Sequence, residues 1–95
     1  MALDVWFRED ARDALLTVGV AALGAAVANG TPDVHYCRGI LDALRAACVA
    51  FGVAWAPFLA DLRAHLASNC VLGVLEAAGV VLLAGNGAVW QVQGR

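Results

Sequence analysis

Apolar residues recur at helical spacing along most of this 95-residue chain, and the breaks between them divide it into four predicted helices. Phe58, Leu59 and Leu62, for example, repeat on one side of a helix, with charged residues between them. The breaks fall at glycine and proline, which end or begin helices. We therefore expect helices over about residues 3–28, 32–51, 56–66 and 70–78.

The clearest helix signals surround the second and fourth elements. Thr31 suits the N-cap of the second helix, Pro32 suits its first position, and Asp33 complements the helix dipole. Gly52 follows the last apolar residue of that helix, and Gly79 stands where a fourth helix would need a residue with positive φ. These signals predict the order of the helices more precisely than they predict the residues at which each helix begins and ends.

The first helix changes character after Asp13. Residues 14–28 carry no charge, and a helix that is apolar on all sides needs burial on all sides. This run is shorter than the ~18–20 residues that span a bilayer, so we expect contact with another subunit, with a membrane as the alternative. Small residues at Gly19, Ala22, Gly24, Ala25 and Ala28 would permit close helix packing.

The last part of the chain has the composition of a β-hairpin. Two apolar, β-branched runs flank Asn86-Gly87, a dipeptide typical of two-residue hairpin turns. We expect strands over residues 80–84 and 88–93. The predicted fold is therefore mainly α with a C-terminal hairpin: four helices followed by two strands, in a single domain over residues 1–95.

This order resembles a winged helix over residues 31–93, with Leu75-Glu76-Ala77-Ala78-Gly79-Val80 running from a third helix into the wing. Residues 1–29 would then form an additional oligomerisation element. Winged helices often bind DNA through that helix and the wing, which the resemblance would place here at residues 70–78 and 80–93. Neither segment contains Arg or Lys, so the resemblance favours the protein-docking and dimerisation roles that winged helices also serve.

Composition points in the same direction. Hydrophobic residues make up 62% of the chain and charged residues 15%, which leaves apolar surface for a compact monomer to expose. The net charge is −2, and the six basic residues are all arginine. A nucleic-acid-binding face needs clustered positive charge, which the sequence does not supply in one segment.

The three cysteines, Cys37, Cys48 and Cys70, have no disulfide or metal-binding spacing, and we expect them to be reduced in a cytoplasmic protein. Cys37 with His35 is the densest reactive group, and a thiolate at a helix N-terminus would be stabilised. No residue is placed to orient the histidine, so a small thiol enzyme using Cys37 is the weakest alternative. We expect no catalytic site, cofactor or metal.

The sequence therefore favours a non-enzymatic protein-interaction or dimerisation module, homodimeric or bound to a protein partner. Trp55 and Trp6 are the candidate partner contacts, because tryptophan is enriched at interface hot spots. The alternative is a winged-helix transcriptional regulator. Its DNA contacts would come from Arg38, Arg45 and Arg63, brought together by folding.

Overall fold

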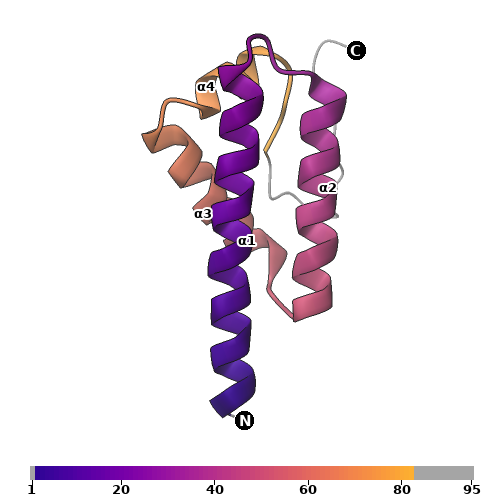
Figure 1. The fold of residues 1–95 in the computed structure, drawn as a ribbon, viewed down its shortest axis with the longest axis vertical. Helices are drawn as coiled ribbons and strands as arrows, with labels where there is room; N and C mark the ends of the chain where they lie inside the picture. Colours follow the sequence, from indigo (N-terminus) through magenta and orange to yellow (C-terminus); the bar gives the residue numbers. More distant parts are fainter. Residues whose placement is uncertain (1, 83–95) are drawn as a thin grey trace.

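The structure, a computed structural model, describes residues 2–82, with side chains from Phe7 onward. It consists of four helices, α1 (Ala2–Ala28), α2 (Val34–Phe51), α3 (Trp55–Ser68) and α4 (Leu72–Ala77). In Figure 1, α1 and α2 lie side by side and run in opposite directions, α3 crosses behind α1, and α4 packs against α3. The N-terminal turns of α1 project beyond the other helices, which gives the molecule its elongated shape of 45 × 27 × 19 Å.

Helix α2 confirms the predicted element and corrects its cap. Asp33, not Thr31, is the N-cap, and its carboxylate accepts hydrogen bonds from the backbone N–H groups of His35 (2.8 Å) and Tyr36 (3.3 Å). At the other end Gly52 adopts φ 71°, so that the N–H of Val53 reaches the carbonyl of Cys48 at 2.8 Å. This is a glycine-dependent C-cap of the kind that the sequence predicts.

Helix α3 ends in the same geometry without a glycine. Cys70 adopts φ 62°, and the N–H of Val71 donates to the carbonyl of Leu66 at 2.9 Å. A side chain in this left-handed conformation is strained by its own Cβ. Because Cys70 takes this conformation, α4 begins at Leu72, two residues later than predicted, and it ends before Gly79 at φ 103°.

The core lies between α3 and the inner sides of α1 and α2. Gly19 of α1 lets the helices approach closely, since a Cβ there would lie 3.0 Å from Leu44 and 3.2 Å from Leu62. Four α3 side chains predicted to face inward are fully buried. The fully buried large side chains, from all four helices and the segment after α4, are Leu23, Cys37, Leu41, Cys48, Phe58, Leu59, Leu62, Leu66, Leu75 and Leu82.

The predicted fold class is wrong in its strands: residues 2–82 form four helices and no strand, so the described chain is mainly α. The first predicted strand begins at Val80, where the chain instead leaves the α4 cap and buries Val80 and Leu82 against the helices. β-branched residues favour any half-buried surface, and here helices provide it. The remainder of the predicted hairpin, residues 83–93, lies outside the described part of the chain.

Candidate interaction surface

Most of α1 is apolar yet lies at the surface. Phe7–Ala28 contains 22 residues and is long and apolar enough to cross a bilayer by length and composition alone, but only 11% of its most apolar window is buried within the chain. In the described part of α1 only Gly19 and Leu23 are buried. The expectation that an all-apolar helix would be covered is therefore not met within one copy of the chain.

The exposed apolar residues of α1 follow a regular spacing. They alternate at intervals of four and three residues, which places them on one side of a helix. Phe7 is 58% exposed and Val18 is 57% exposed, and the remaining members are alanines. All are exposed except Ala11, which is half-buried. We call this set the apolar stripe; its members are Phe7, Ala11, Ala14, Val18, Ala21, Ala25 and Ala28.

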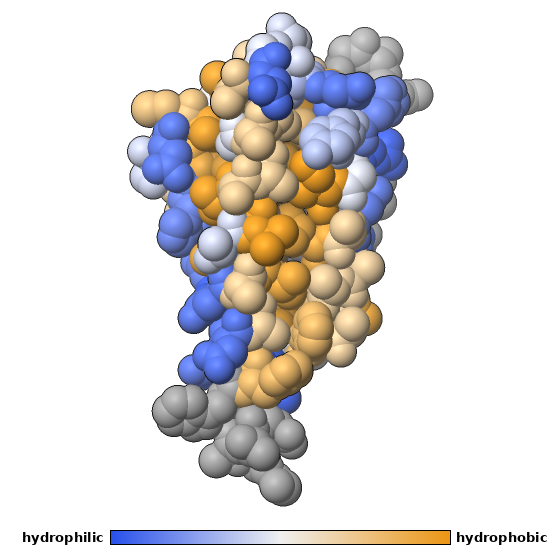
Figure 2. All heavy atoms as spheres, in the orientation of Figure 1, coloured by the Kyte–Doolittle hydropathy of each residue, from blue (hydrophilic) through white to orange (hydrophobic). Residues whose placement is uncertain are grey.

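Helix α2 continues this surface. Phe7 of the apolar stripe packs against Phe51 with ring centroids 5.6 Å apart, so the two helices share a face at this end. Figure 2 shows apolar side chains gathered over the front of α1 and α2. The α2 members again follow intervals of four and three, and we call the combined surface the two-helix face; its α2 residues are Tyr36, Ile40, Ala43, Ala47 and Phe51.

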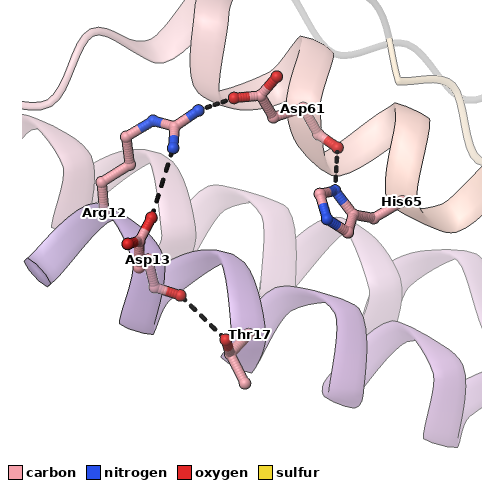
Figure 3. Close-up of polar contacts among 5 residues, drawn as sticks. All are labelled: Arg12, Asp13, Thr17, Asp61 and His65. Atoms are coloured by element: carbon pink, nitrogen blue, oxygen red, sulfur yellow. Dashed lines mark hydrogen bonds and ion pairs between the residues drawn. The ribbon is translucent and has the colours of Figure 1, made fainter. Parts of the chain in front are cut away.

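Polar groups border the two-helix face. On α1, Asp10, Asp13 and Thr17 form an edge beside the apolar stripe, and the Thr17 hydroxyl donates to the Asp13 carbonyl at 3.0 Å. Behind this edge Arg12 pairs with Asp13 and reaches across to Asp61 of α3 (Figure 3). The His65 Nδ1 donates to the Asp61 carbonyl at 2.8 Å. These polar side chains join α1 to α3 and leave the apolar stripe uninterrupted.

The two tryptophan candidates have different surroundings. Trp55 is the first residue of α3, where it is partly buried and stacks on Phe58 with ring centroids 5.8 Å apart. Trp6 lies in an early turn of α1, outside the described side chains. The exposed aromatic residues Phe7, Tyr36 and Phe51, in contrast to the partly buried Trp55, belong to the two-helix face. Tyr36 and Phe51 were missed in the sequence because partner contacts were sought only among the tryptophans.

The arginines proposed for DNA contact lie on two helices. Arg63 of α3 donates to Glu76 of α4 at 3.1 Å, so its charge is compensated. Arg38 and Arg45 lie on α2, with Asp42 between them on the same side of the helix. This distribution lacks the contiguous positive charge that phosphate binding requires.

Cys37 is buried and does not form a reactive pair with His35. The thiol is 0% exposed, whereas His35, two residues earlier in α2, is exposed. Burial raises the pKa of the Cys37 thiol, and the negative charge of Asp33 raises it further. The expected stabilisation of a thiolate by the helix N-terminus is therefore outweighed, and the protonated thiol behaves as a small apolar side chain.

Other chemistry is sparse over residues 2–82. No three His, Cys, Asp or Glu side chains there come together to hold a metal ion. An open groove of about 400 Å³ runs along α3 and α4 and is lined by apolar residues with Arg63. A second hollow, of about 300 Å³, has His65 and Thr17 as its polar groups. In the second hollow the Thr17 hydroxyl donates to the Asp13 carbonyl and the His65 Nδ1 donates to the Asp61 carbonyl, so the two side chains are not hydrogen-bonded to each other.

Comparison of the chain with protein-family models, with curated proteins and with solved structures found no match. The winged-helix resemblance therefore stays a prediction from the sequence, and the case for function depends on the surface alone.

Proposed function

We propose that the protein is a non-enzymatic interaction module that associates through the two-helix face. The observation that supports this proposal is the coincidence of length and exposure in α1: Phe7–Ala28 is long and apolar enough to cross a bilayer, but only 11% of its most apolar window is buried within the chain. Soluble monomers rarely expose continuous apolar surfaces of this extent, and such surfaces usually mark association sites. Tyr36 (61% exposed) and Phe51 (40% exposed) add aromatic area on α2.

The polar border favours a protein partner over a lipid surface. Helices that lie on membranes usually carry Lys or Arg beside their apolar face, which attract anionic headgroups. Here the border contains Asp10 and Asp13, which anionic lipids would repel. Arg12 and Asp61 also form an ion pair between α1 and α3. If α1 spanned a bilayer, this ion pair would lie near one end of the apolar stretch, where burying charge is costly.

The proposal predicts that the chain is not a monomer. Light scattering during size-exclusion chromatography at micromolar concentration should give at least twice the chain mass of 9.8 kDa. Val18→Glu places a charge in the centre of the apolar stripe and should reduce the mass to that of one chain. Thr17→Glu is the matched control, because Thr17 is also exposed but lies on the polar edge.

The outcome that contradicts this proposal is a monomer with a helical circular dichroism spectrum. Flotation with phosphatidylcholine vesicles tests whether a lipid bilayer, instead of a protein, covers the apolar face. A chain that floats with the vesicles, and that Val18→Glu releases, would show that a bilayer covers the face. A chain that sediments alone while showing twofold mass supports self-association.

A further inference from the structure

We draw no further inference here: the strongest candidate, the open apolar groove of about 400 Å³ along α3 and α4 that Leu59, Ala64 and Leu72 line beside Arg63, carries none, because nothing in residues 2–82 shows what covers it.

Discussion

Helices α3 and α1 are both rich in apolar residues, but α3 packs its large apolar side chains into the core, whereas α1 leaves Phe7 and Val18 exposed. In α3 the large residues Phe58, Leu59, Leu62 and Leu66 are at most 1% exposed. In α1 the apolar residues extend round most of the helix, and α2 and α3 cover only the side that contains Gly19 and Leu23. The comparison shows that periodicity, more than hydrophobicity, decides what one copy of a chain can bury: α3 has one apolar side and α1 has more than one.

The largest expected effect is the difference in stability between a substitution in the centre of α3 and one on the outer side of α1. Phe58→Ala should lower the free energy of unfolding by about 3–5 kcal/mol, because it leaves a cavity in the core. Val18→Ala, at a residue 57% exposed, should change it by about 0.5 kcal/mol or less in the dissociated chain. Urea melts at high dilution measure both. Equal losses would mean that the outer side of α1 is packed inside the monomer.

Substitutions at two glycines next compare the inner and outer sides of α1. Gly19→Val should destabilise the fold by about 1–3 kcal/mol, because the new side chain would collide with Leu44 and Leu62. Gly24→Ala should stabilise it by about 0.5–1 kcal/mol, since nothing lies within 4 Å of the added Cβ and alanine favours the helix. Thermal melts followed by circular dichroism compare the two. The same sign at both positions would contradict the packing of α1.

The ends of the two helices provide a smaller contrast. After α1 the chain turns at Gly30 with φ 116°, whereas after α3 it turns at Cys70 with φ 62°. Cys70→Gly should raise the free energy of unfolding by about 1 kcal/mol, because glycine has no Cβ to strain. Cys70→Ala removes the thiol but keeps the Cβ, so it should give no such gain. Chemical denaturation of the two variants distinguishes strain from thiol chemistry.

The smallest expected effect is the ion pair that joins the two helices. Arg12 and Asp61 are 32% and 47% exposed, so water screens their attraction. A double-mutant cycle with Arg12→Ala and Asp61→Ala should give a coupling of about 0.2–1 kcal/mol that decreases with added salt. Arg12 with Asp13, at 3.5 Å and with a more exposed carboxylate, serves as the control pair. A larger coupling between Arg12 and Asp13 than between Arg12 and Asp61 would show that Asp13 is the main partner of Arg12.

The sequence predicted the order and number of the helices because those depend on local signals. Gly52 and Gly79 cap helices as expected, and Phe58 with its leucine neighbours faces inward. The N-cap was wrong by two residues because Thr31 and Asp33 both suit the role, and only the path of the chain selects Asp33. The predicted strand at Val80 was wrong because β-branched residues suit burial against helices as well as burial in a sheet.

The surface was predictable only in part. The four-and-three spacing from Phe7 to Ala28 is written in the sequence, but which side of α1 meets α2 depends on Gly19, whose close approach to Leu44 appears only in three dimensions. Tyr36 and Phe51 share apolar spacing with Leu44, and the sequence alone does not separate the half of that stripe that turns inward. In both α1 and α2, packing between residues far apart in the sequence determines which side turns inward.

Helix α1 lies between α2 and α3 and contacts both of them, while α2 and α3 meet each other much less. One element therefore holds the fold together on one side and carries the proposed partner surface on the other. If the proposed association occurs, folding and association are thermodynamically linked through α1, because a bound copy would stabilise the folded chain by mass action. The melting temperature should climb as the protein is concentrated, and the cell could adjust the lifetime of this protein through its abundance.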